Sequence, residues 1–287
     1  KDTIVPLISY GGGTENSGAL LARNNLIVNV TAADLNFANI TIELFNSTGL
    51  VNRTISAFSS YFVNFTNLQD GIYYFNATAF DLAGNNNFTE TRNVTLDTKA
   101  PLYSNLTENP MDPATYFSGQ RYEFNVTWSD VYLDKVFIEF NGVNYSASNV
   151  GSVYNFSIFD LAAGNYNYRW YANDSSGNLN NSEVGSYTIN KATGSVYLYL
   201  NNSRSNITLN VGTSVLINAS LVNGQFGSLN LTLNDVQINY STASNLTNLH
   251  LFNSTGNYVV RANYSGNQNY TGNVEEWNVT VRDITLP

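Results

Sequence analysis

The chain has 287 residues and a formal net charge of −9, and 43% of its residues are hydrophobic, 14% aromatic and only 11% charged. A chain this apolar folds rather than staying disordered, and its length predicts two or three domains. The acidic balance and the 12 scattered Lys and Arg residues exclude the basic patch of a nucleic-acid-binding protein.

Cysteine content and hydropathy say little about the cellular compartment. The chain has no cysteine, which fits a secreted protein as well as a cytosolic one. No run approaches the roughly eighteen apolar residues of a membrane helix, and the chain does not open like a signal peptide. We therefore expect no membrane span in this sequence, which is either a processed chain or an excerpt.

The first segments of the chain predict a loop followed by a strand. YGGGTENSG (10–18) is rich in glycine, but it lacks the Gly-Lys-Thr sequence and the helix of a phosphate-binding loop. In NLIVNVTA (25–32), Leu26, Val28 and Val30 alternate with polar residues, as in a half-buried strand. The Gly-rich stretch is therefore expected to connect strands.

Further along, one pattern occurs three times. Residues 70–85, 163–178 and 255–269 each contain Gly-x-Tyr followed by alternating apolar and polar residues. The glycines are Gly71, Gly164 and Gly256. Their spacing gives a unit of about 93 residues, the size of an immunoglobulin-like sandwich of seven or so strands.

A second motif marks where the units begin. DTIVP (2–6), DTKAP (97–101) and DITLP (283–287) share an Asp and a closing Pro. We therefore predict an all-β protein of three tandem immunoglobulin-like β-sandwich domains in a linear array. The predicted domains are 1–96, 97–190 and 191–282, and 283–287 is either the start of a further repeat or a strand that contacts the next subunit.

The Gly-x-Tyr motif also suggests a structural role for its tyrosine. In immunoglobulin-like sandwiches a Tyr at the start of the sixth strand often ties the preceding loop through its hydroxyl group. The candidates for this corner are Tyr73, Tyr166 and Tyr258. The alternative is that all three are simply aromatic residues of the core.

Three sequence stretches resemble known families of repeats. AFDLAGNNN, followed by VTLDTKAP, resembles the immunoglobulin-like repeats of bacterial and archaeal surface proteins. YRWYANDSSGNLNNS is similar to a related archaeal version, and NYSGNQNYTGN to a third prokaryotic class. The resemblance covers the whole chain. It implies a sandwich fold and a cell-surface location, and it brings no catalytic residues.

Acidic residues are expected to gather at one pole of each of the first two units. In an immunoglobulin-like topology the leading segment and the loops after the second and sixth strands meet at one end. The carboxylates placed there are Asp2, Asp34 and Asp81 in the first unit and Asp97, Asp130 and Asp174 in the second. Such oxygens suit calcium, the one cofactor we consider. The alternative is that each Asp caps its own turn. The third unit has Asn223 and Asn267 instead.

Asn-x-Ser/Thr sequons are abundant, and many lie in predicted strands. There the Asn and the Ser or Thr share the outer face, while the residue between them points inward. N-linked glycans need exposed Asn residues. Candidates are Asn29, Asn39, Asn76, Asn93, Asn125, Asn155, Asn206, Asn230, Asn263 and Asn278. The alternative is that a composition rich in Asn and Thr produces sequons by chance.

No catalytic arrangement is evident, so we expect no enzyme. The one histidine, His250, has no carboxylate near it in sequence. Glu275 and Glu276 are adjacent on a predicted strand, so they face opposite ways and cannot act as a glycosidase pair.

These observations favour a non-enzymatic structural protein of the extracellular cell surface, as a glycosylated stalk, surface-layer element or filament subunit. Its partners would be copies of itself, packed head to tail, or other surface proteins. The alternative is an adhesin that binds a protein or glycan of a host or neighbouring cell through exposed aromatic residues. Candidates for such contacts are Tyr10, Tyr103, Tyr116 and Tyr197.

Overall fold

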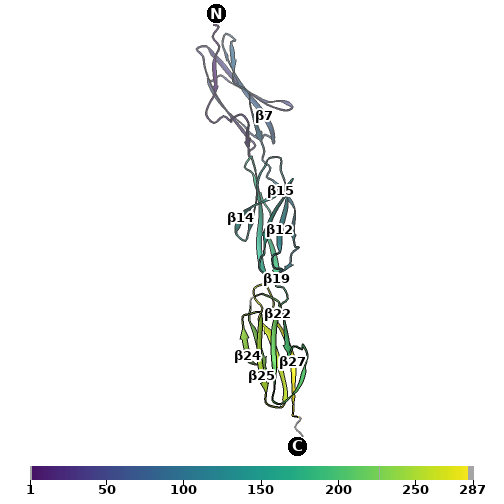
Figure 1. Ribbon diagram of the computed structural model, residues 1–287. Helices are drawn as coiled ribbons and strands as arrows, with labels where there is room; N and C mark the ends of the chain where they lie inside the picture. Colours follow the sequence, from purple (N-terminus) through teal and green to yellow (C-terminus); the bar gives the residue numbers. More distant parts are fainter. Residues whose placement is uncertain (1, 226, 284–287) are drawn as a thin grey trace.

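The computed structural model describes residues 2–225 and 227–283, and these form three β-sandwiches in an end-to-end row (Figure 1). The two ends of the chain lie at opposite ends of the rod (Figure 1). The described residues contain strands and no helix, so they contain no helix that could cross a membrane. The predicted all-β class and the three tandem immunoglobulin-like domains are confirmed. Most of the predicted further repeat, residues 284–287, lies outside the described residues.

Domain 1 has a three-stranded sheet facing a larger one. The strands are β1 (Leu7–Tyr10), β2 (Ala19–Leu21), β3 (Leu26–Ala33), β4 (Phe37–Asn46), β5 (Gly49–Ser56), β6 (Ser60–Phe65), β7 (Gly71–Asp81), β8 (Asn86–Phe88) and β9 (Arg92–Leu96). One sheet has the order β1-β3-β6 and the other β2-β9-β7-β4-β5, with β8 on β7.

Domain 2 repeats this arrangement. Its strands are β10 (Leu102–Asn109), β11 (Ala114–Thr115), β12 (Arg121–Ser129), β13 (Leu133–Phe140), β14 (Val143–Ser146), β15 (Ser148–Val150), β16 (Val153–Phe159), β17 (Gly164–Asp174), β18 (Leu179–Asn181) and β19 (Gly185–Asn190). The sheets have the orders β10-β12-β16-β15 and β11-β19-β17-β13-β14, with β18 on β17.

Domain 3 has fewer short strands. They are β20 (Ser195–Leu200), β21 (Ile207–Asn210), β22 (Thr213–Asn223), β23 (Leu229–Leu233), β24 (Val236–Ser241), β25 (Asn245–Phe252), β26 (Gly256–Tyr264) and β27 (Asn273–Arg282). The sheets have the orders β20-β22-β25 and β21-β27-β26-β23-β24.

The strands form where the sequence alternates, because one face of each sheet packs into the sandwich. In β17, Tyr168, Trp170 and Ala172 are buried while the residues between them are half-buried. Each domain has more than seven strands, in part because its leading strand changes sheets. Its first part pairs antiparallel in one sheet, and its second part (β2, β11 or β21) pairs parallel with the last strand in the other.

Candidate metal centre at two domain poles

The six predicted aspartates come together in two groups of three. Within each group, one oxygen from each carboxylate lies within 4.8 Å of the others. The first group, called pole 1, contains Asp2, Asp34 and Asp81. The second, pole 2, contains Asp97, Asp130 and Asp174. In each group one Asp precedes the first strand, one follows the strand that begins the core (β3 or β12), and one ends β7 or β17.

Backbone amides hold each carboxylate of pole 1 in place. Ile4 N donates to Asp2 at 3.0 Å and Asn36 N donates to Asp34 at 2.7 Å. Asn85 donates to both oxygens of Asp81, from its backbone and side-chain nitrogens, each at 2.7 Å. These are the turn-capping bonds that Asp makes without a metal. They account for the orientation of each carboxylate. They do not explain why three negatively charged groups lie this close together.

Pole 2 repeats the backbone hydrogen bonds of pole 1 and the double contact of its asparagine. Lys99 N donates to Asp97 at 3.2 Å, and Tyr132 N donates to Asp130 at 2.7 Å. Asn178 donates to the two oxygens of Asp174 at 2.8 Å each. The repetition shows that the two poles are equivalent positions of one domain design.

Burial raises the free-energy cost of keeping these carboxylates charged side by side, because little water surrounds them. Asp81, Asp97 and Asp174 are only 4%, 7% and 1% exposed. At Asp2, the amide hydrogen bonds from Ile4 and then from the Asn36 side chain lower the carboxyl pKa, so this group carries its charge at neutral pH. Like charges this close repel unless a cation lies between them. Calcium binds oxygens at about 2.3–2.6 Å, so oxygens on its opposite sides lie about 5 Å apart. The spacing at both poles fits that limit.

Each pole also clamps the segment that leads into its domain. The Asn85 side chain donates to the carbonyls of Asp2 and Ile4, and the Asn87 side chain donates to that of Pro6. In domain 2, side-chain amides from Asn178 and Asn180 reach the carbonyls of Asp97, Lys99 and Pro101. The sequence analysis gave no role to these asparagines. Their signal was present, because each pair follows the last Asp of its pole by four and six residues.

The equivalent pole of domain 3 is built differently. Lys191 Nζ donates to the carbonyl of Asn267 at 2.7 Å, and the Asn223 side chain donates to that of Thr193. A lysine ammonium therefore lies at this pole, which has amides where domains 1 and 2 have carboxylates.

The three motif tyrosines make the same hydrogen bond. Each hydroxyl donates at 2.9 Å to the carbonyl four residues earlier, from Tyr73 to Gln69, from Tyr166 to Ala162 and from Tyr258 to Ser254. Burial raises the pKa of the Tyr166 hydroxyl. Gly71 and Gly256 have φ values of 149° and 148°, a backbone conformation that favours glycine. Gly164 does not adopt this conformation. In domains 1 and 2 the bonds fix the loop that lies at the opposite end of the domain from its aspartates.

Replacing Tyr73 by Phe should lower the free energy of unfolding of domain 1 by about 0.5–1.5 kcal/mol, because the Gln69 carbonyl loses its partner while the ring still packs. Denaturant unfolding measures the change. The control is Tyr74→Phe, since Tyr74 is 40% exposed. An equal, small effect of both changes would contradict a structural role for the hydroxyl.

The ten sequon asparagines differ in how accessible they are. Asn93, Asn206 and Asn278 are exposed, whereas the other seven candidates are half-buried. The middle residue is buried in every one of these sequons except that of Asn206, where Ile207 is half-buried. Asn155 donates its side-chain amide to Asn125 at 2.7 Å on the neighbouring strand. Two glycans on this pair would compete for the same space.

Of the aromatic residues expected at the surface, Tyr116 is buried, while Tyr10, Tyr103 and Tyr197 are half-buried. Tyr116 was expected to be exposed, but it is only 6% exposed and packs on Tyr270. Tyr10 lies under the Arg92 guanidinium and Tyr197 under that of Arg204. His250 stacks edge-to-face on Phe252 in β25. The expectation for Tyr116 is wrong because it took no account of the neighbouring domain.

Glu275 and Glu276 do not work as a pair. Glu275 accepts hydrogen bonds from the Leu198 backbone and the Arg204 side chain, whereas Glu276 pairs with Arg261. The two carboxylates therefore belong to separate ion pairs.

No known family of proteins and no curated protein matches the sequence. Solved structures of multi-domain chains are similar in architecture. An I-band fragment of titin has 14% sequence identity, covers 98% of this chain and 100% of its own, and gives a TM-score of 0.47. The corresponding values for a 1.5-MDa bacterial ice-binding adhesin are 13%, 99%, 100% and 0.40. For the fibronectin(III)-like modules of CbhA from Clostridium thermocellum they are 16%, 64%, 93% and 0.36.

Proposed function

We propose that this chain is a non-enzymatic structural element of an extracellular surface, a stiff stalk or filament segment that carries N-linked glycans. The observation that carries the proposal is the end-to-end row of three sandwiches whose leading segments are hydrogen-bonded to the domain that follows (Figure 1). Such tethering leaves little free linker between domains, so each domain adds length. Copies packed head to tail would extend the same row.

The aromatic residues first considered as adhesive contacts do not support adhesion, although other aromatic side chains, among them Phe58, Phe88 and Phe117, are exposed. An adhesin binds through exposed anchors, often Tyr, Trp or Arg. Here Tyr116 is buried between domains, and the rings of Tyr10 and Tyr197 are covered by guanidinium groups. Imaging of the native surface tests the proposal. Fibres or stalks with an axial repeat of about three domain lengths would support it, and isolated chains that bind a ligand array would support the adhesin instead.

Calcium is the ion that we propose for poles 1 and 2. The three converging carboxylates at each pole would supply part of the six to eight oxygens that calcium takes. Pole 2 lies where domain 1 meets domain 2, so an ion there would hold the Asp97 segment against domain 2. The Lys191 ammonium at the third pole supplies a fixed positive charge and makes an ion unnecessary there.

Calcium in hundredfold excess over its dissociation constant should stabilise each occupied domain by about 2.7 kcal/mol relative to a chelator. Scanning calorimetry of the full chain measures this. Asp34→Asn and Asp130→Asn should each abolish the shift of one domain while keeping the backbone hydrogen bond at Oδ1. In chelator these variants should be as stable as the parent or more stable, since a like charge is gone.

Asp160→Asn is the matched control. Asp160 also accepts a backbone hydrogen bond, from Gly119 N at 2.9 Å, but it lies outside both poles. It should leave the calcium shift intact. A parent chain with the same melting temperature in calcium and in chelator would refute the ion sites. The rod-like role could survive that result, since it depends on the domain row.

A further inference from the structure

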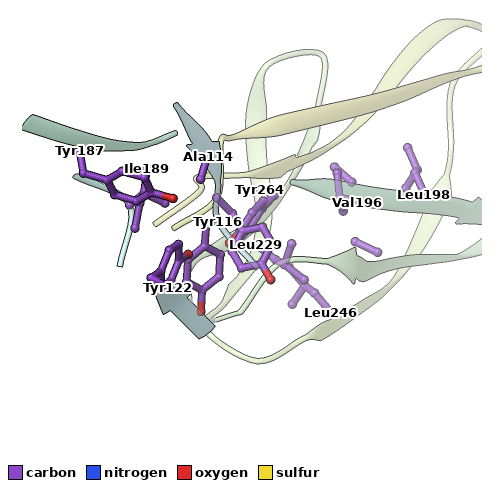
Figure 2. Packing of buried hydrophobic residues seen from close by; sticks show 14 of the residues in the cluster. Ala114, Tyr116, Tyr122, Tyr187, Ile189, Val196, Leu198, Leu229, Leu246 and Tyr264 are labelled. Carbon is purple, nitrogen blue, oxygen red and sulfur yellow. The ribbon is translucent and has the colours of Figure 1, made fainter. Parts of the chain in front are cut away.

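The two junctions of the rod differ in how much apolar surface they share. Buried residues of domains 2 and 3 belong to one continuous hydrophobic cluster, which extends from β12 and β19 into β20, β23 and β26. Figure 2 shows part of this cluster, with Ala114 and Tyr116 of domain 2 and Leu229, Leu246 and Tyr264 of domain 3 labelled. The buried residues of domain 1 form a separate cluster.

Two tyrosines join the cores across the second junction. Tyr116 follows β11, and Tyr270 lies in the loop between β26 and β27. Their rings pack edge to face with centroids 5.5 Å apart, and the residues are 6% and 8% exposed. Aromatic pairs of this kind contribute beyond the area they bury.

Hydrogen bonds also connect domains 2 and 3 at this junction. Ala163 of domain 2 is 4% exposed, and domain 3 satisfies both of its backbone groups. Ala163 N donates to the Asn269 side chain at 2.9 Å, and the Gln268 side chain donates to the Ala163 carbonyl. The linker between the two domains is bonded to the same loop, since Ala192 N donates to the Asn269 carbonyl at 2.9 Å. Moving the domains apart would break these hydrogen bonds and expose the apolar surface of the junction to water, which costs free energy.

The first junction is polar and loosely filled. Asp70 at the end of domain 1 accepts hydrogen bonds from the Thr98 backbone and hydroxyl at 3.0 and 2.9 Å. Its other contact here is Lys99, at 4.0 Å and 82% exposed. A crevice of about 250 Å³ lies beside these residues, and Val131 at its edge is 87% exposed. Exposed charge pairs of this kind hold domains only weakly.

We infer that the rod consists of two mechanical bodies rather than three. Domains 2 and 3, residues 97–282, unfold together and move as one, and domain 1 pivots against them at the first junction. The inference depends on the packing at the junctions and does not require the proposed surface role or calcium. For a stalk it means that bending is confined to one joint.

Calorimetry of the full chain tests the unfolding unit. In chelator we expect two transitions whose enthalpies are in a ratio of about one to two, because enthalpy scales with the number of residues that unfold. The double variant Tyr116→Ala/Tyr270→Ala should split the larger transition into two. Three separate transitions, or a single one, in the parent chain would overturn the inference.

Tyr103→Ala is the matched control for the double variant. Tyr103 packs on Trp128, with ring centroids 5.6 Å apart, but both residues belong to domain 2. This change should lower the midpoint of the larger transition without splitting it. If it splits the transition as well, the splitting does not report on the junction.

The joint can be tested without disturbing either interface. The chain has no cysteine, so spin labels can be placed by substitution at the exposed residues Ser60, Ser152 and Ser244, one in each domain. Pulsed electron resonance should give a narrow distance distribution for Ser152→Cys/Ser244→Cys and a broader one for Ser60→Cys/Ser152→Cys. Equal widths, or the reverse order, would contradict a single joint.

Discussion

Trp170→Ala is expected to lower the free energy of unfolding by about 3–5 kcal/mol, the usual cost of removing a large aromatic side chain from a packed core. Trp170 is 0% exposed and lies at the centre of β17, opposite Ile138 of β13. Its backbone is also held, because Ser182 bonds to both its N–H and its carbonyl. The strand should therefore stay in place around the cavity, which limits any relaxation that would reduce the cost. Calorimetry and denaturant unfolding measure the loss.

Two further substitutions serve as comparisons for Trp170→Ala, one at an exposed residue of the same domain and one at a buried residue of domain 1. Leu179→Ala, on the neighbouring strand β18, removes a side chain that is 75% exposed and should change stability by less than about 0.5 kcal/mol. Phe75→Ala removes a fully buried side chain from domain 1. Phe75→Ala should lower the transition of domain 1 alone, whereas Trp170→Ala should lower domains 2 and 3 together. A Trp170→Ala chain whose domain 3 melts unchanged would contradict the shared unit.

Gly194→Ala is expected to destabilise the chain by at least about 1–3 kcal/mol, the cost of overpacking a filled site. Gly194 is buried just before β20. An added Cβ would lie 2.1 Å from the Thr271 carbonyl oxygen and 2.8 Å from the Tyr264 ring. The oxygen belongs to the backbone, in the loop that contacts domain 2, so it cannot move aside without disturbing the second junction. Unfolding of the larger unit should show the effect.

Gly12→Ala is the control for this substitution. A Cβ at Gly12 would meet no atom within 4 Å, and its φ lies outside the region that favours glycine. It should change stability by no more than about 0.5 kcal/mol. A Gly194→Ala chain as stable as Gly12→Ala would show that the linker into domain 3 is more adaptable than its packing implies.

The aspartate groups of poles 1 and 2 were predictable in part. Strand order alone brings the leading segment and two loops to one end of a sandwich, so the six aspartates could be grouped from sequence. The amide clamps of Asn85 and Asn178 were missed, since their repeated spacing from an Asp does not tell which backbone carbonyl the amide reaches. The Lys191 contact at the third pole was also missed, because a lysine tip can reach many positions.

The sequence by itself determined the strands, their inward faces and the size of the repeating unit. Alternation with a period of two and turn-forming residues at short intervals act locally, and each strand carries them within its own residues. Only the tertiary structure decided how the domains are joined. Tyr116 and Tyr270 are far apart in the chain, and each has the sequence context of an ordinary surface aromatic. Whether such side chains face solvent or one another depends on how two complete domains meet, which is set by the shape and hydrogen bonding of both surfaces together.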